Sequence, residues 1–151
     1  MVSILWIGLI AGTLDITENL VFNLFRGITP RRVFQYIASG LIGAQAFQSG
    51  WASVVLGVIL HYAIALIWTA IFYVACLRFA VIPRRPILSG LIYGGLVYLI
   101  MNFIALPFSG VPHPRNAITL ASRINGVLAL LFCIGLPISL LVRRTLFQTR
   151  I

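Results

Sequence analysis

Long apolar stretches, separated by short connections that carry arginine, limit most strongly how this chain can fold. The longest runs from Trp51 to Leu77 and contains no Asp, Glu, Lys or Arg. About 20 consecutive apolar residues in a helix cross the hydrocarbon core of a bilayer. The chain has room for four or five such stretches, so the pattern predicts an integral membrane protein built from helices.

The composition excludes an ordinary soluble domain. Charged residues make up 9% of the chain and hydrophobic residues 61%, whereas a soluble domain carries about a quarter charged residues. We therefore expect one integral membrane domain over residues 1–151, an all-α polytopic transmembrane helical bundle. The N-terminus lacks the positive start of a signal peptide, so "MVSILWIGLI" is interpreted as part of a retained first span.

The expected membrane segments differ in length. They cover approximately residues 3–25, 33–48, 51–77, 87–108 and 118–142. Thr29 and Pro30 predict the start of the second segment, since a threonine N-cap followed by proline is typical of a helix start. This second segment reaches only ~24 Å, less than a bilayer core of ~30 Å. It is therefore expected to be short or re-entrant beside four full-length spans. Pro137 is expected to bend the last segment.

The arginines predict an orientation. The chain has eleven arginines, no lysine and a net charge of +9. They flank the apolar stretches instead of forming one patch, which argues against nucleic acid and indicates topology signals and contact with anionic lipids. Five crossings with the N-terminus outside leave Arg115 and Arg123 outside and nine arginines in the cytoplasm. Without a crossing of the second segment, the better split is six to five. We therefore expect five membrane segments and a cytoplasmic C-terminus.

Asp15 and Glu18 are the only carboxylate side chains of the sequence, and both lie inside the first apolar segment. At 100° per residue, small and polar residues share one side of this helix: Gly8, Ala11, Gly12, Asp15, Glu18, Asn19 and Asn23. An ionised carboxylate that faces lipid at this depth costs a few kcal/mol or more. The polar side of the helix is therefore expected to face protein or trapped water.

Two other segments carry small and polar residues every four positions. They are Ser53, Gly57, His61, Ala65 and Thr69 in the third segment, and Gly90, Gly94, Tyr98 and Asn102 in the fourth. Such residues allow close helix approach, and we expect Gly57, Gly90 and Gly94 to be packing positions. Helical rise places two of the polar groups, Asp15 and His61, ~18 Å and ~15 Å deep. The predicted buried polar cluster consists of Asp15, Glu18, Asn19, His61, Asn102 and Arg123.

This cluster has three interpretations: hydrogen bonds that join helices, a proton or ion pathway, and a ligand or cofactor site. A proton shared between an acid and His61 is compatible with all three. No ExxH or HxxxH spacing indicates a metal site. His113 lies in the outer loop, ~15 Å in depth from His61, which argues against a haem held by two histidines. No GxSxG motif indicates a serine nucleophile. We expect no catalytic residue, metal or cofactor, and expect Cys76 and Cys133 to be buried free thiols.

Three strings resemble a family of small, uncharacterised proteobacterial inner-membrane proteins. They are "YIASGLIGAQAFQSG", "LGVILHYAIALIWTAIFYVA" and "GLIYGGLVYLIMNFIALPFSG". The resemblance covers roughly residues 33–110. It implies a bacterial inner membrane and a helical bundle, and it implies no particular activity.

We expect a non-catalytic integral membrane protein that serves as an accessory or assembly subunit of a larger membrane complex, or that forms a homo-oligomer. Its partners would be anionic lipids and other membrane subunits or further copies of itself. A first alternative is a small proton-linked transporter or channel with Asp15 and Glu18 as titrating groups, His61 as a relay and Asn102 as a ligand. A second alternative is a membrane enzyme or a lipid- or quinone-binding protein. It would work at the inner leaflet near Arg26, Arg31 and Arg32.

Overall fold

The computed structural model describes residues 2–112 and 119–148, and this described part is helical, without a strand. Four of its helical stretches are long and apolar enough to cross a membrane: Ser3–Phe25, Gly50–Arg78, Pro86–Ala105 and Leu120–Phe147. This confirms the predicted all-α membrane bundle with four full-length spans. In chain order the elements are α1 (Val2–Phe25), α2 (Pro30–Ile42), η1 (Gly43–Phe47), α3 (Gly50–Arg78), α4 (Val81–Arg84), α5 (Pro86–Ile100), η2 (Met101–Ala105), α6 (Leu120–Ala129), η3 (Leu130–Gly135) and α7 (Leu136–Gln148).

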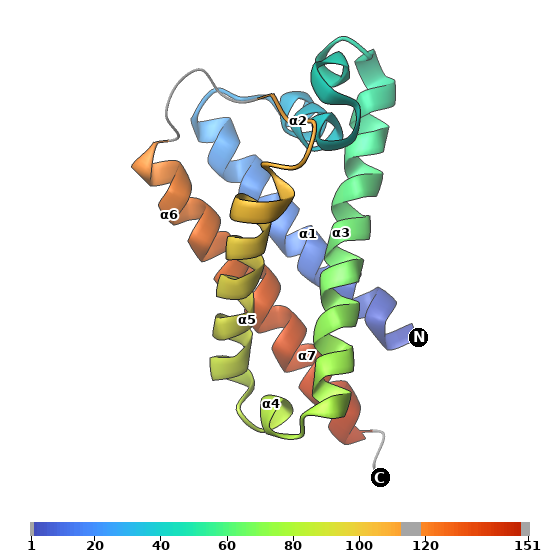
Figure 1. The fold of residues 1–151 in the computed structure, drawn as a ribbon, viewed down its shortest axis with the longest axis vertical. Coiled ribbons are helices and arrows are strands. Elements are labelled where there is room, and N and C mark those ends of the chain that lie inside the picture. The colour runs from blue at the N-terminus through green and yellow to red at the C-terminus, as the bar shows by residue number, and fades with distance from the viewer. Residues whose placement is uncertain (1, 113–118, 149–151) are drawn as a thin grey trace.

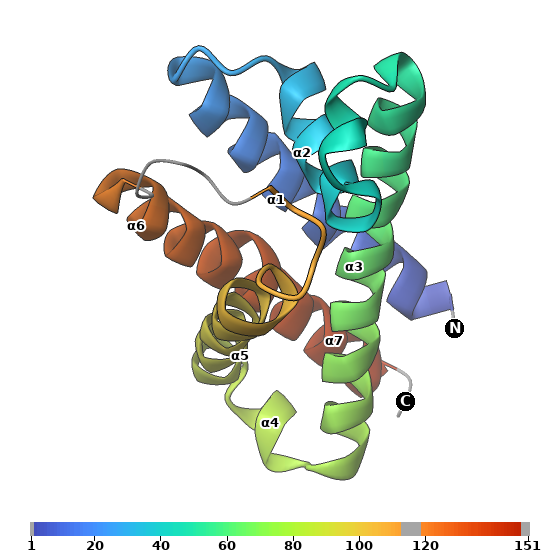
Figure 2. The same ribbon diagram turned by 45° about the horizontal axis from the view of Figure 1, so that its top comes forward.

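The four spans alternate in direction. Figure 1 shows α1 running upward, α3 downward, α5 upward and the continuous α6–η3–α7 stretch downward. The start of α1 and the end of α7 therefore both lie in the lower half of the view. α1 packs on α3 and on η3 and α7, and α5 packs on η3 and α7 from the other side. α3 and α5 stand apart from each other, as both views show (Figures 1 and 2).

The second membrane segment is short, as expected. It begins as predicted, with the Thr29 hydroxyl accepting a hydrogen bond from the backbone of Arg32. It stops earlier than expected, because Gly43 adopts a φ of +64° and a 3₁₀ turn follows. The thirteen residues of α2 span only ~20 Å. α2 lies across the upper end of the bundle, between the end of α1 and the start of α3 (Figures 1 and 2). α2 is therefore a short second segment beside four full-length spans, as expected, and the start of α1 and the end of α7 lie at the same end of the bundle.

Two spans contain a π-helical turn, η2 and η3, and each turn is followed two residues later by a proline, Pro107 or Pro137. Proline lacks a backbone N–H, and its ring clashes with the carbonyl group four residues earlier. Those carbonyls belong to Phe103 and Cys133, both inside the π turns. A π turn widens the helix locally and relieves the clash. The distortion expected at Pro137 is therefore present as η3, just before the proline.

The glycines expected to be packing positions lie against the backbone of neighbouring helices. A Cβ added at Gly57 would overlap the carbonyl group of Phe34 in α2, and one at Gly94 would overlap the carbonyl group of Leu130 in η3. A Cβ at Gly90 would lie 2.9 Å from the carbonyl oxygen of Gly135. These glycines let α3 approach α2 and let α5 approach η3, which fixes the walls of the bundle interior.

Candidate functional site

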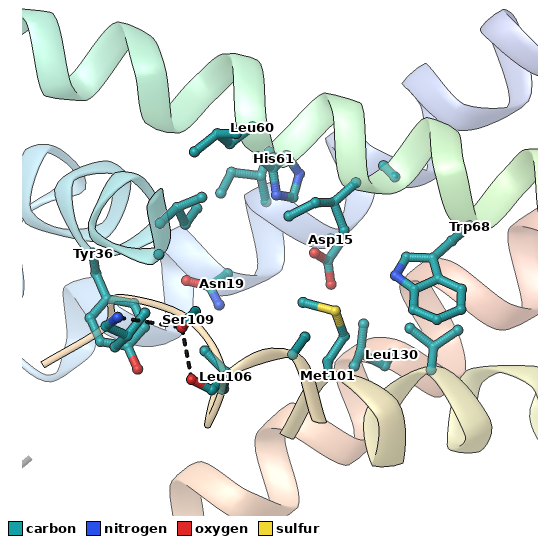
Figure 3. A pocket seen from close by; sticks show the side chains of 18 of the residues that line it. Asp15, Asn19, Tyr36, Leu60, His61, Trp68, Met101, Leu106, Ser109 and Leu130 are labelled. Atoms are coloured by element: carbon teal, nitrogen blue, oxygen red, sulfur yellow. Dashed lines mark hydrogen bonds between the residues drawn. The ribbon is translucent and has the colours of Figure 1, made fainter. Parts of the chain in front are cut away.

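A cavity of about 440 Å³ lies inside the upper half of the bundle. This volume falls in the range of small-molecule pockets. Residues from α1, α2, α3, α5, η2, η3 and the loop after η2 line it, and most of them are apolar. Figure 3 shows the side chains that matter for the chemistry of the cavity: Asp15, Asn19, Tyr36, His61, Trp68, Met101 and Ser109.

The upper end of the cavity is closed by α2 and by the loop that follows η2. The backbone N–H of Gly110 donates to the carbonyl oxygen of Gly40 at 2.9 Å. A Cβ at Gly110 would lie 3.0 Å from the carbonyl oxygen of Ser39, so a larger residue would push the loop away from α2. The short second segment thus acts as a roof over the bundle interior.

Aromatic side chains join α3 and α5 next to Trp68, which lines the cavity. The Tyr93 hydroxyl donates to the backbone carbonyl of Trp68, which joins α5 to α3. The rings of Phe72 and Tyr93 pack with centroids 4.7 Å apart, and both residues are buried. Above this contact α3 and α5 separate, and the cavity is lined by Leu60 and Ile64 on one helix and by residues of η2 on the other. The cavity thus extends between α3 and η2.

Asp15 projects its carboxyl group into the cavity, toward Met101 on the opposite wall (Figure 3). It accepts no hydrogen bond and forms no ion pair with any described residue. Its electrostatic neighbours are Glu18 on the same helix and His61 on α3. The cavity thus contains one acidic group whose hydrogen-bonding capacity is unused by the described part of the chain.

His61 lies at the level of Asp15 and lines the same cavity. Its Nε2 atom is 2.8 Å from the carbonyl oxygen of Gly12. Because a carbonyl oxygen only accepts, Nε2 carries a proton and donates it to α1. The neighbouring Tyr62 hydroxyl forms a second α3–α1 hydrogen bond, 3.0 Å long, with the hydroxyl of Thr13. The imidazole is therefore a helix connector as well as part of the cavity wall.

Asn19 lines the cavity one helical turn after Asp15. Its side-chain oxygen accepts a hydrogen bond of 3.0 Å from Nδ2 of Asn23. Its own Nδ2 makes no hydrogen bond to the described residues. Residues four apart lie on one face of a helix, so α1 presents a carboxyl group and an amide to the cavity together.

Glu18 belongs to the polar face of α1 but does not line the cavity. Its Oε2 atom is buried and has no hydrogen-bond partner among the described residues. Both Glu18 and Asp15 interact electrostatically with the thiol of Cys133 in η3. Cys133 and Cys76 are free thiols. Glu18 is thus a second acidic group close to Asp15, outside the residues that line the cavity.

The structure does not bring two of the expected cluster residues to this site. Asn102 donates to the carbonyl oxygen of Tyr98 in its own helix at 3.0 Å, and it does not line the cavity. Arg123 is exposed on α6 and makes no ion pair with a described residue. His113 lies outside the described residues. Asp15, Asn19 and His61 therefore come together, whereas Asn102 and Arg123 do not join them.

Several residues of the cavity had no individual signal in the sequence. Trp68, Met101 and Ser109 lie in apolar or loop stretches that predict nothing specific about them. Ser109 is held by its own loop, since its hydroxyl donates to the carbonyl oxygen of Leu106 at 2.7 Å. The sequence marked the cavity only indirectly, through two prolines. Pro107 and Pro137 mark the two π turns that line the cavity, and π turns frequently occur at functional sites.

The polar groups on the cavity wall are few and come from different helices. Within the described residues, no group of three or more His, Cys, Asp or Glu side chains is arranged to hold a metal ion. Tyr36 from α2 offers a hydroxyl group whose pKa is raised by desolvation, so the phenol keeps its proton. An apolar cavity with a few convergent polar groups is the usual form of a small-molecule site.

No protein-family model, no curated protein and no solved structure matches the chain. The functional argument therefore depends on the geometry of the bundle and of its cavity.

Proposed function

We propose that this chain is a non-catalytic membrane protein that binds one small hydrophobic molecule inside its bundle. The observation that carries the proposal is the apolar cavity of about 440 Å³, which Asp15 borders and which extends between α3 and α5 beyond their contact at Tyr93. A molecule dissolved in the bilayer reaches this cavity between α3 and α5 without crossing water. The binding site is the bundle interior and not the arginines near the membrane surface.

The geometry supports the binding function better than an open proton channel. A channel needs a polar path that continues through the bundle. Below the cavity the interior is filled by Phe72, Val97 and Ile138, which are buried and apolar. These apolar side chains interrupt the polar path between the polar groups of α1 and the lower end of the bundle.

The geometry also weakens one reason for an accessory-subunit function. An accessory subunit would use small-residue positions such as Gly57, Gly90 and Gly94 to contact its partner. All three lie against other helices of the same chain. A partner subunit is therefore not needed to explain them.

We further propose that the protein resides in a bacterial inner membrane, as the resemblance of residues 33–110 implies. With four crossings, five of the described arginines lie at the end that holds the start of α1 and the end of α7, and four lie at the opposite end. The positive-inside rule then assigns the chain ends to the cytoplasm by a margin of one residue. α2 and the roof of the cavity would accordingly face the outside.

Fluorescence of Trp68 tests the binding function, because this indole lines the cavity whereas Trp6 and Trp51 are exposed. The double variant Trp6→Phe and Trp51→Phe leaves Trp68 as the single tryptophan. The protein, in nanodiscs of zwitterionic lipid, is titrated with a dodecanol that carries bromine, a collisional quencher, at mid-chain. Binding in the cavity is expected to give quenching that saturates.

Two phenylalanine substitutions separate the cavity from the outer surface. Ala105→Phe fills part of the cavity, since Ala105 lines it. Ile104→Phe adds similar bulk one residue away, on a side chain that is 55% exposed toward the membrane. Saturable quenching should disappear in the first variant and persist in the second. Quenching could instead rise linearly and equally in the single-tryptophan protein and in both variants. That result would show simple partitioning of the probe into lipid and would disprove the proposal.

A further inference from the structure

We infer that the molecule taken by this cavity is a lipophilic amine, whose nitrogen contacts the carboxyl group of Asp15. This inference rests on the proposed binding function and assigns the chemical class of the ligand. The decisive juxtaposition is an acid without a hydrogen bond to the described residues, Asp15, inside an apolar cavity that no described arginine lines.

The charge distribution of the chain supports a basic ligand. The protein has a net charge of +9, yet no arginine of the described residues lines the cavity. The titratable side chains on its wall are Asp15, Tyr36 and His61. The His61 Nε2 proton is already donated to Gly12. No arginine on the wall therefore occupies Asp15, and a positively charged ligand complements its carboxyl group.

The hydrogen-bonding state of Asp15 points to a donor. A carboxyl group that is removed from water without a partner costs free energy that a hydrogen bond recovers. No described residue supplies that bond to Asp15. An amine supplies one or more N–H donors together with charge, an alcohol supplies one neutral donor, and a carboxylate supplies none. The amide of Asn19 on the same face of α1 can contact the same head group.

The depth of Asp15 determines how such a pair can form. Asp15 follows thirteen residues of α1, ~20 Å along the helix, and so lies near the middle of a bilayer core of ~30 Å. An isolated charge at this depth is costly. A neutral amine can enter from lipid and meet the neutral acid, and one proton then moves. The O–H bond of Asp15 breaks and an N–H bond forms, giving an ammonium carboxylate pair with no change in the net charge of the site.

The groups that face Asp15 favour the cationic form of the ligand. Glu18 on α1 is a second acid nearby, and Cys133 on η3 is an uncharged thiol or an anion. His61 on α3 is the one potential cation among these neighbours, and its Nε2 proton is directed at the carbonyl oxygen of Gly12. The immediate surroundings of Asp15 thus attract a positive nitrogen.

A series of head groups on one chain tests the inference. The protein with Trp68 as its single tryptophan is titrated in zwitterionic nanodiscs with mid-chain brominated dodecylamine, dodecanol and dodecanoate. The amine is expected to bind roughly ten- to a hundredfold more tightly than the alcohol, as a hydrogen bond to a charged group would provide. The dodecanoate should bind most weakly.

Substitutions at the two acids assign the preference to one residue. Asp15→Asn should lower the affinity for the amine to that for the alcohol, while the affinity for the alcohol stays nearly constant. Asp15→Glu should keep the preference for the amine. Glu18→Gln is the matched control, because Glu18 does not line the cavity, and it should also keep the preference.

The outcomes separate this inference from the function on which it rests. Equal saturable binding of amine and alcohol by the protein with native Asp15 would overturn the amine inference and leave the binding function intact. Tighter binding of the dodecanoate would overturn it as well. Absence of saturable quenching by all three probes would overturn the binding function itself. The comparison among head groups uses native Asp15, so it does not depend on the folding of an Asp15 variant.

Discussion

At the scale of single residues, the contact between His61 and Gly12 explains why α1 and α3 fit together at mid-membrane. Gly12 has no side chain, so the imidazole reaches its carbonyl oxygen at 2.8 Å. A Cβ at this glycine would lie 3.0 Å from Cβ of Ala65 and 3.2 Å from the ring of Tyr62. One small residue thus permits both the close approach of the helices and the hydrogen bond that joins them.

Loss of this hydrogen bond should lower stability by a modest amount. We expect His61→Leu to reduce the free energy of unfolding by about 0.6–1.7 kcal/mol, the range measured for hydrogen bonds between membrane helices. Unfolding in mixed micelles with increasing SDS measures the change. Ile59→Leu is the control, since Ile59 is 59% exposed on the same helix. Equal stability of the His61 variant and the control would show that the bond adds nothing.

The sequence predicted the depth of the polar residues along the bundle better than the side of the bundle that they face. Helical rise placed Asp15 and His61 near one depth, and the two line one cavity. Depth alone does not determine which side of the bundle a residue faces once the helices are packed. Asn102 therefore bonds to its own helix and Arg123 is exposed, although both were expected beside the acids.

At the scale of helices, the contact between α5 and η3 depends on a glycine that faces backbone. We expect Gly94→Ala to destabilise the bundle by about 1–3 kcal/mol, as overpacking does, because the added Cβ overlaps the carbonyl group of Leu130. Gly95→Ala is a control with the same chemistry at the next position. Its Cβ would meet only Cδ2 of Leu131, at 3.9 Å. Thermal unfolding in detergent compares the two variants, and an equal effect of both would contradict the close packing.

The position of α2 gives a second prediction at this scale. Single cysteines at Arg26 and Ser49, in a background of Cys76→Ser and Cys133→Ala, mark the two ends of the second segment. Both positions are exposed and adjoin the upper end of the bundle. A membrane-impermeant maleimide should therefore label both from the same side of the membrane, and Arg84→Cys from the other side. Labelling of Arg26→Cys and Ser49→Cys from opposite sides would establish the fifth crossing.

The four long spans were predictable because apolar length suffices to identify them. The path of the second segment was not, since its crossing was inferred from the distribution of arginines. The structure ends this helix at Gly43, where the positive φ requires glycine, and turns the chain back toward α3. A break of this kind depends on one backbone angle. The pattern of polar and apolar residues in the segment does not reveal it.

At the scale of the whole molecule, the features that close the bundle also create its cavity. The glycines draw α5 onto η3 and α3 onto α2, while α3 and α5 meet only near Tyr93. The π turns that precede Pro107 and Pro137 bend two walls around the same space. The cavity could not be predicted from sequence, because it depends on how far apart packed helices lie and not on any residue pattern.

Ligand binding should therefore be measurable as stability of the whole bundle. A molecule that binds the folded protein alone stabilises it by about 2.7 kcal/mol at a concentration of one hundred times its Kd. We expect dodecylamine at that excess to raise the free energy of unfolding by this amount in wild-type protein. At the same concentration the gain should fall markedly in Asp15→Asn and vanish in Ala105→Phe.

Ile104→Phe is the control for this measurement, because its added ring faces the membrane and leaves the cavity open. It should gain as much stability from dodecylamine as the wild type. A gain of the same size in Ala105→Phe would show that the amine acts on the protein through the surrounding lipid. In that case the space between α3 and α5 would be filled by ordinary lipid chains, and Asp15 would serve the packing of α1 alone.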